Sequence, residues 1–176
     1  MTNTTTSQPS TVNDPAQQAL VLRTIKKKSF AVLSTVSNQG FPHAAGVVYD
    51  TINAADHGPI VLYTHTMRSS RKARNIEAHG RAGVVIPVRK LPVGPPFTVQ
   101  FQARAALLAM DDPEITAHLT AGRLKKISGH GELDESDGCF IRIEPRGLIH
   151  SYGLGVSILA LARDPLHAGA RSVAMG

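Results

Sequence analysis

The sequence is poor in cysteine, aromatic residues and long apolar runs. It holds one cysteine, Cys139, no tryptophan, and 5% aromatic residues in all. A single cysteine excludes a disulfide within the chain and a thiolate metal cluster, and scarce aromatics argue against a stacking platform for nucleic acid. The longest apolar run, around residues 156–162, falls well short of the roughly 20 residues that span a bilayer. We therefore expect a cytoplasmic protein whose partners include neither nucleic acid nor a membrane.

Motifs of metal enzymes and hydrolases are also missing. No glycine-framed serine provides the nucleophile elbow of a Ser-His-Asp hydrolase. Among eight histidines, His43 and His65 have no spacing typical of metal ligands, and we expect no metal site. His150 and Tyr152 share one face of an expected strand, where they would reach either a cofactor edge or a subunit interface. No acid or base stands out, so the catalytic residues are unknown.

Length and charge indicate the number of domains and the kind of partner. A chain of 176 residues with 42% hydrophobic content is expected to form one domain with a buried core. The polar residues 1–14 are expected to be a disordered tail, residues 15–153 the folded domain, and residues 154–176 a C-terminal extension of that domain. The formal charge of +6 favours an anionic ligand.

The hydrophobic pattern contains more strands than helices. Helices are expected after Pro15, before Gly80 and after Pro113. Strands are expected at residues 30–37, 42–49, 60–64, 82–88, 97–108, 139–144 and 148–152, with a turn at 145–147 and an irregular or helical tail from residue 153. Many antiparallel strands with few helices predict a mainly β fold, a closed antiparallel barrel with helices added to it.

The helix that ends at Gly80 begins with a group of cations. The basic residues of this segment face a single acid, Glu77, and they are Arg68, Arg71, Lys72, Arg74 and Arg81. A helix N-terminus carries partial positive charge, so cations there are unfavourable unless an anion joins them. With Ser69 or Ser70 as the cap, and with Arg71 and Lys72 beside free amides, this turn is expected to bind a phosphate. A solvated basic face is the alternative interpretation.

The order of elements and the residues Tyr63, Thr64, Ser70, Arg71 and Lys72 resemble the pyridoxamine 5'-phosphate oxidase superfamily of flavin-binding split barrels. The likeness covers about residues 20–153. Its marks are the opening hairpin LSTVSNQGFPHAAGVVY, the strand LYT and the segment SRKARNI. The resemblance implies a split β-barrel of about six to seven antiparallel strands. It also implies a homodimer with FMN in a groove between the subunits.

The resemblance also implies which residues bind the cofactor. Those matching Tyr63 and Thr64 line the flavin, and those matching Arg71 and Lys72 hold its phosphate after the cap at Ser70. Small residues of the second strand, among them Val47 and Val48, match positions along the ring. Thr98 matches a flavin-contacting position, and Gln100 shares its strand face. The expected cofactor-binding set is Val47, Val48, Tyr63, Thr64, Ser70, Arg71, Lys72 and Gln100.

Departures from the family pattern limit the reaction. The authentic oxidases carry an arginine where this chain has Ala45 and a lysine near Asp50, and their C-terminal tryptophan is absent here. We therefore expect an FMN-binding oxidoreductase that acts on an unidentified small substrate rather than on pyridoxamine phosphate. One alternative is a deazaflavin-dependent reductase of the same fold, and another is a noncatalytic flavin- or heme-binding protein.

Overall fold

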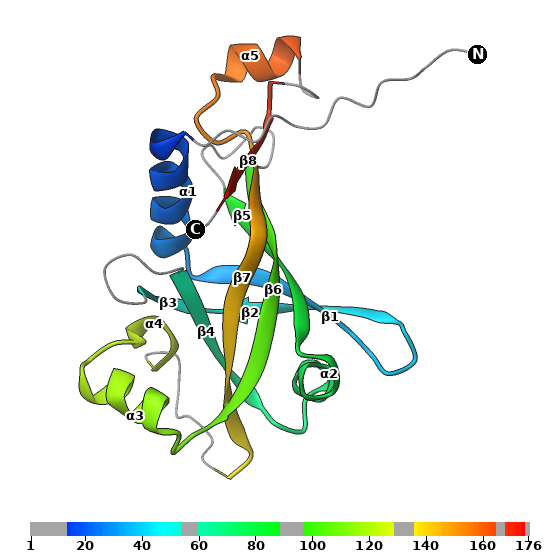
Figure 1. Cartoon of the computed structure of the whole chain (residues 1–176), viewed down its shortest axis with the longest axis vertical. Helices are drawn as coiled ribbons and strands as arrows, with labels where there is room; N and C mark the ends of the chain where they lie inside the picture. The colour runs from blue at the N-terminus through cyan, green and yellow to red at the C-terminus, as the bar shows by residue number, and fades with distance from the viewer. Residues whose placement is uncertain (1–13, 54–59, 89–96, 129–135, 165–167, 175–176) are drawn as a thin grey trace.

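The strands form one antiparallel sheet that curls on itself (Figure 1). The computed structural model describes residues 14–53, 60–88, 97–128, 136–164 and 168–174. The strands are, in chain order, β1 (Phe30–Val36), β2 (Pro42–Val48), β3 (Asp50–Asn53), β4 (Ile60–Met67), β5 (Arg81–Val88), β6 (Phe97–Ala109), β7 (Gly138–Tyr152) and β8 (Ala170–Ala174). Their spatial order is β2-β1-β5-β6-β7-β4-β3, and β8 pairs with the second half of β7.

The sheet must curl because the chain ties its two ends together. β2 and β3 lie at opposite ends of the strand order, yet only Tyr49 separates them in the sequence. Within the described residues no hydrogen-bonded ladder joins β2 to β3 or β4, so the barrel stays split. The expected mainly β split barrel is confirmed. Closure by hydrogen bonds, which the strand pattern alone predicted, is wrong for the described residues.

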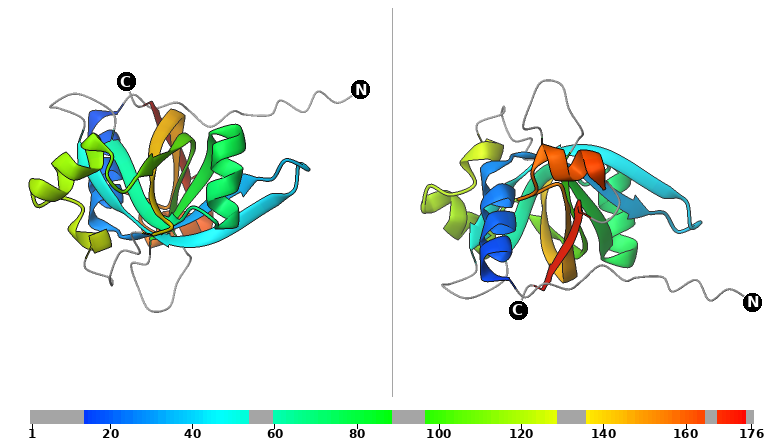
Figure 2. Two further views of the ribbon diagram at one scale, coloured as in Figure 1. Left: turned by 90° about the horizontal axis from the view of Figure 1, so that it is seen from below. Right: turned by 90° about the horizontal axis from the view of Figure 1, so that it is seen from above.

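Helices pack at the ends of the barrel and over part of its outer surface. They are α1 (Pro15–Lys27), α2 (Arg71–His79), α3 (Pro113–Thr120), α4 (Lys125–Ser128) and α5 (Ile158–Arg163). Viewed along the long axis, α1 and α2 flank the sheet on opposite sides (Figure 2). Val21 and Ile25 of α1 and Ile76 of α2 are buried in the main core. α3 and α4 cover a second apolar cluster that includes Tyr63 and Phe140. No described helix is long and apolar enough to cross a membrane.

Local signals place the first helix where the sequence predicts it. The Asp14 side chain accepts a hydrogen bond from the amide of Ala16 at 2.9 Å, and Pro15 occupies the first helical position. Lys26 and Lys27 stand in the last turn, where the helix dipole favours cations. The apolar stripe of α1, predicted from its 3.6-residue period, is buried against the main core.

Replacing Tyr49 by phenylalanine is expected to destabilise the fold by about 0.5–1.5 kcal/mol at neutral pH. The buried Tyr49 hydroxyl donates to the Ile25 carbonyl at 2.8 Å and ties the junction of β2 and β3 to α1. Burial, with a smaller effect of Asp50, raises the pKa of this hydroxyl above its ordinary value of 10.0. The folded state therefore holds the proton more tightly, and stability falls as the pH rises above that value.

Urea unfolding at neutral pH and at about pH 11 measures both effects. The Tyr49→Phe variant should lose less stability between the two conditions than the unaltered protein, because it lacks one of the hydroxyls that must ionise. An equal loss in both proteins would contradict the assignment of this pH dependence to Tyr49.

β7 is one continuous strand, which corrects the expected turn at residues 145–147. Pro145 lies within the ladder opposite Ala103 of β6, and the irregularity is a bulge in which Gly147 takes a φ of 68°. On its other side β7 pairs with β4 up to Ile143 and with β8 from Leu148. Pro145 falls in the gap between these two partners, so a proline here interrupts no ladder on that side of β7.

Two short strands were not predicted. β3 comprises four residues, and β8 comprises five in the tail that was expected to be irregular or helical. Both pair along one side only, β3 with β4 and β8 with β7. Segments this short carry too few alternating positions for a reliable two-residue period, so pairing with a long neighbour decides their conformation.

Candidate functional site

Ser70 caps the basic helix α2. Its backbone is extended, and its hydroxyl oxygen accepts a hydrogen bond from the Ala73 amide at 3.3 Å. The same hydroxyl lies 3.2 Å from Thr66 Oγ1 at the end of β4. The helix ends at Gly80, whose φ of 61° is the left-handed conformation that glycine adopts readily. The predicted strand, the N-cap at Ser70, the helix and its end at Gly80 are confirmed.

Part of the charge compensation at this helix comes from the chain itself. The Asp137 carboxylate accepts hydrogen bonds from the Ser69 hydroxyl and, at 3.3 Å, from the Ser69 amide. Glu77 forms an exposed ion pair with Arg68 at 3.7 Å. Asp137 was not predicted as part of this site, because it is far along the chain and only the pairing of β4 with β7 brings it to the helix.

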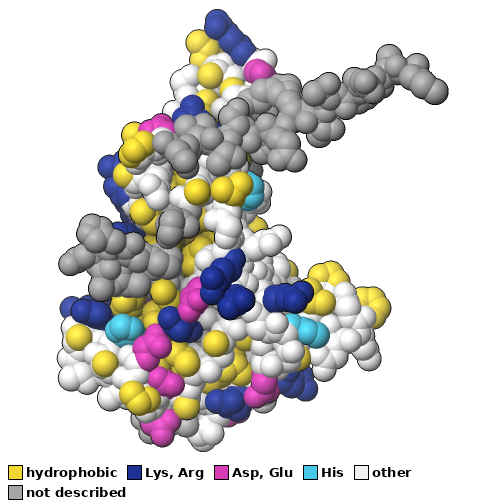
Figure 3. Space-filling view, in the orientation of Figure 1, with side chains coloured by type: hydrophobic (Ala, Val, Ile, Leu, Met, Phe, Trp, Pro, Cys, Tyr) yellow, Lys and Arg dark blue, Asp and Glu magenta, His cyan; other side chains and the backbone are white. Residues whose placement is uncertain are grey.

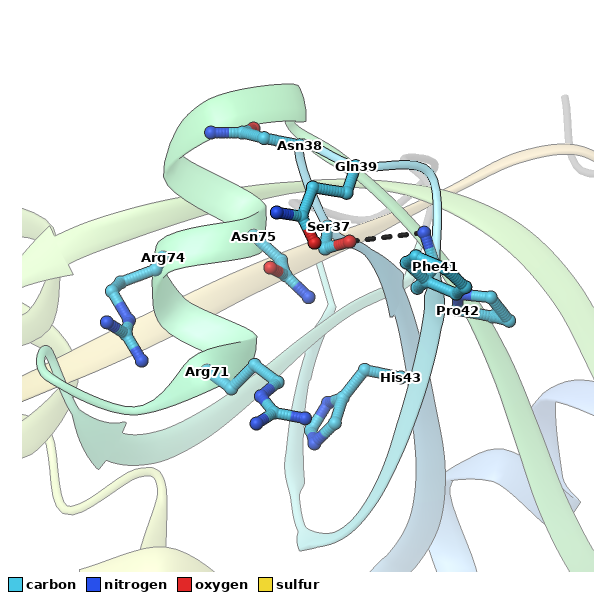
Figure 4. Close-up of a pocket in the computed structure, with 9 residues that line it drawn as sticks. All are labelled: Ser37, Asn38, Gln39, Phe41, Pro42, His43, Arg71, Arg74 and Asn75. Carbon is cyan, nitrogen blue, oxygen red and sulfur yellow. Dashed lines mark hydrogen bonds between the residues drawn. The ribbon is translucent and has the colours of Figure 1, made fainter.

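Arg71 and Arg74 line a cavity of about 480 Å³ between α2 and the β1–β2 hairpin, and the Arg71 side chain points toward the hairpin (Figure 4). The Arg71 guanidinium lies beside the ring of His43, which comes from β2. We call this cavity the anion pocket. Its lining residues include no acid, and they are Ser37, Asn38, Gln39, Phe41, Pro42, His43, Arg71, Arg74 and Asn75. The space-filling view shows cationic and histidine side chains beside the hairpin tip (Figure 3).

Three side chains of the anion pocket, those of Arg71, Arg74 and His43, have ring or guanidinium nitrogens that lack a partner among the described residues. Among the described residues no carboxylate lies within 4.0 Å of the Arg71 or Arg74 side chain. The buried Nδ1 atom of His43 has no hydrogen-bond partner there either. Asn75 is held in place because its side-chain amide donates to Thr35 Oγ1 at 2.9 Å. The pocket therefore offers fixed donors and two uncompensated cations to an anion.

Lys72 points to the other side of the helix start. Successive helical residues are about 100° apart around the axis, so Lys72 and Arg71 diverge. Partial burial lowers the pKa of the Lys72 ammonium, and the neighbouring Cys139 thiol opposes this effect. Burial likewise raises the pKa of Cys139, which is fully buried as the sequence predicted. A half-buried ammonium with no described carboxylate partner is stabilised by an anion at the helix start.

Tyr63 and Thr64 lie on opposite faces of β4 and do not form one surface. Tyr63 is buried under α3, where its hydroxyl donates to Glu114 and its ring meets His118 edge-on at 5.4 Å. Burial first, and Glu114 second, raise the pKa of the Tyr63 hydroxyl well above its ordinary value. Arg142 pairs with Glu114 at 3.3 Å. Tyr63 therefore belongs to a structural network, and its side chain does not line the anion pocket.

The remaining predicted residues lie away from the anion pocket. Val47 is buried in the main core, and Val48 points to the opposite face of β2. Gln100 lines a second cavity of about 500 Å³, which it shares with Ser34, Gly83 and His150 among others. The Nδ1 atom of His150 lies 2.7 Å from the Ser172 hydroxyl. We call this the sheet cavity.

The anion pocket and the sheet cavity lie on opposite faces of β1. Ser34 lines the sheet cavity, whereas the next residue, Thr35, bonds to Asn75 of the anion pocket. Adjacent strand residues point to opposite faces, so one protomer does not present both cavities to a single small ligand on one surface. The structure brings Ser70 and Arg71 together with His43 and Arg74. It does not bring them together with Gln100.

Comparisons with known proteins agree with this architecture. A sequence model described as pyridoxamine 5'-phosphate oxidase matches residues 18–150. A search of curated proteins gives no significant match.

Solved structures with the same fold come from several bacteria. The heme storage protein HutZ of Vibrio cholerae is 17% identical with a TM-score of 0.59, covering 81% of this chain and 96% of its own. General stress protein 26 of Bacillus anthracis is 23% identical with a TM-score of 0.56, covering 77% and 92%. An FAD-binding protein of Mesorhizobium loti is 18% identical with a TM-score of 0.55, covering 76% and 89%. At these identities the likeness establishes the fold alone.

Proposed function

The chain belongs to the pyridoxamine 5'-phosphate oxidase family, and from this premise we propose that it binds FMN and acts as a flavin-dependent oxidoreductase on a small substrate. The observation that carries the proposal is the anion pocket. Arg71 and Arg74 line it, His43 adds a ring nitrogen, and no acid is among its lining residues. A structural neighbour is described as FAD-binding, which supports a flavin for this fold.

The first turn of α2 supplies the donors that a phosphate needs. The Ser70 hydroxyl accepts a hydrogen bond from the Ala73 amide. The first backbone hydrogen bond of the helix runs from the Arg74 amide to the Ser70 carbonyl. The amides of Arg71 and Lys72 therefore have no intrahelical acceptor and are available to a ligand. The Arg71 guanidinium provides a planar fork from one side, and the Lys72 ammonium provides a point charge from the other. These donors and cations match the charge and the hydrogen-bond acceptors of a dianionic phosphate.

Bound FMN would supply the acceptor for a hydride, and the protein would position it. The hydrogen bond from Asn75 to Thr35 holds α2 against β1, and this keeps Arg71 of the helix and His43 of the hairpin at a fixed separation. The absence of an evident acid and base in the sequence is compatible with this chemistry, because the side chains bind and orient rather than react.

We further propose that the protein is a homodimer that binds FMN at the interface between its two subunits. Gln100, which shares a strand face with Thr98, the residue that matches a flavin-contacting position of the family, lies in the sheet cavity on the far face of β1 from the anion pocket. A single FMN contacts both sets of residues if the second set belongs to another copy of the chain. Phe30 and Phe41, which are 47% and 69% exposed, lie on the hairpin and would be covered by such a partner.

The proposal predicts that FMN binds at least about tenfold more tightly than riboflavin, which has the same ring without the phosphate. Fluorescence titrations of the purified protein at fixed salt measure both affinities, with a deazaflavin and heme as further ligands. Equal affinities for FMN and riboflavin would contradict the assigned phosphate site. Preference for the deazaflavin would favour the related reductase, and tight heme binding without oxidation of a nicotinamide donor would favour a noncatalytic protein.

A further inference from the structure

A third cavity, of about 760 Å³, lies far from the anion pocket and shares no residue with it. We call it the basic groove. In Figure 1 its elements, β3, α4 and the end of α1, are at the left, whereas the hairpin tip beside the anion pocket is at the right. Its lining residues are Lys26, Asp50, Thr51, Ile52, Asn53, Gly122, Arg123, Leu124, Lys125 and Lys126.

One cation and the single acid of the basic groove are already engaged with each other. The Lys126 ammonium lies 3.5 Å from the Asp50 carboxylate, which also accepts from the Lys126 amide at 3.1 Å. The same ammonium donates to the carbonyls of Lys26 and Lys28 at 2.6 and 3.2 Å. Lys126 thereby neutralises both Asp50 and the carbonyl end of α1, whose partial negative charge would otherwise repel an anion.

Three further cations of the basic groove are uncompensated. Lys26, Arg123 and Lys125 are exposed, and among the described residues no carboxylate lies within 4.0 Å of their side chains. The position of Lys26 has a local explanation, because the helix dipole favours a cation in the last turn of α1. Arg123, two residues beyond the C-cap Ala121 of α3, has the same local explanation.

The backbone between α3 and α4 presents these two cations to solvent. Leu124 is the one described non-glycine residue with a positive φ, 58°, and its side chain is 1% exposed within the second apolar cluster. Bulky residues adopt this conformation only where the surrounding structure imposes it. By anchoring Leu124 inward, the chain turns Arg123 and Lys125 outward on either side of it, and Gly122 before them also has a positive φ.

We propose that the basic groove binds a small anion with several phosphate groups, such as the triphosphate portion of a nucleotide or inorganic tripolyphosphate. Its free cations come from three separate segments, the end of α1, the α3–α4 turn and α4, and an anion with several phosphate groups carries a charge for each of them. Thr51 and Asn53 of β3 add neutral hydrogen-bonding groups along the same cavity. This site is independent of the proposed FMN site.

Calorimetric titration with tripolyphosphate, ATP and orthophosphate at one ionic strength tests the proposal. We expect saturable binding of tripolyphosphate at one site per chain, with orthophosphate weaker by about tenfold or more. ATP binding as tightly as tripolyphosphate would indicate a nucleotide as the source, and weaker ATP binding would indicate the inorganic anion. Equal binding of orthophosphate, or no saturable binding, would overturn the proposal. So would tighter binding of single-stranded RNA whose affinity rises with its length.

Two double variants distinguish binding at the basic groove from general attraction of the anion to a positively charged protein. Arg123→Gln with Lys125→Gln should weaken tripolyphosphate binding by about tenfold or more, because two free cations leave the groove. Arg81→Gln with Arg163→Gln removes the same charge from exposed positions outside the groove and should leave the affinity unchanged. Equal losses in both would overturn the proposal.

FMN titrations show whether a negative result concerns the anion site in the basic groove or the proposed FMN site. The Arg123→Gln, Lys125→Gln variant should bind FMN as the unaltered protein does, and its thermal unfolding should confirm that it folds. Displacement of FMN by tripolyphosphate at the concentration that fills the new site would overturn the separation of the two sites.

Discussion

Replacing Arg71 and Lys72 together by alanine is expected to weaken FMN binding by about 10- to 100-fold and to leave riboflavin binding unchanged. A charge-assisted hydrogen bond contributes about 1.5–3 kcal/mol, and partial exposure of both side chains reduces that value here. The two ligands differ only in the phosphate, so comparing them isolates the contacts made by α2. Fluorescence titration of each variant with both ligands gives the four affinities that are needed.

The control for this experiment removes two positive charges elsewhere. Arg81→Ala with Arg163→Ala alters two exposed positions that line neither the anion pocket nor the sheet cavity, and it should bind FMN normally. If it loses as much affinity as the α2 variant, general attraction to a basic protein explains the binding. If the α2 variant binds FMN and riboflavin as the unaltered protein does, the phosphate does not bind at this helix.

Gly153→Ala is expected to destabilise the fold by about 2–5 kcal/mol, the sum of two effects. Gly153 follows β7 with a φ of +75°, which an alanine adopts only at a cost of about 1–2 kcal/mol. In addition, a Cβ atom there would lie 2.0 Å from Cδ1 of Phe97, a buried core residue. Overpacking of this kind adds about 1–3 kcal/mol. Calorimetry should show a melting temperature lower by about 5–20 °C.

Gly147→Ala is the matched control for this steric effect. Gly147 has a φ of +68°, close to that of Gly153, but a Cβ atom added there would meet nothing within 4 Å. This variant should therefore lose only the conformational contribution, about 1–2 kcal/mol. Equal destabilisation of the two variants would show that the side chain of Phe97 moves aside without cost.

Local chemistry in the sequence predicted the separate elements well. The Asp14 and Pro15 start of α1, the Ser70 cap, the Gly80 stop and the long alternation of β6 each depend on residues a few positions apart. Such signals act over one helical turn or one strand, so they can be recognised without knowledge of the fold. The family resemblance then supplied the split barrel that these elements form.

Signals that depend on distant partners were missed. β3 and β8 are short and exist through pairing with β4 and β7, and Asp137 reaches Ser69 only because β7 runs beside β4. The expected turn at Pro145 became part of a strand for the same reason, since the gap between two neighbours of β7 accommodates it. Composition and local period contain no information on such pairings.

The sequence by itself determined the ends of the main helices, the longer strands and the basic turn at Ser70, Arg71 and Lys72, because capping, alternation and helix charge act locally. Only the tertiary structure decided how the predicted site residues are distributed. It turned Tyr63 toward Glu114 and placed Gln100 across β1 from Arg71. It also brought His43 beside Arg71 (Figure 4). The physical reason is that strand residues alternate between two faces, and which face meets a helix, the core or solvent depends on how the whole sheet curls.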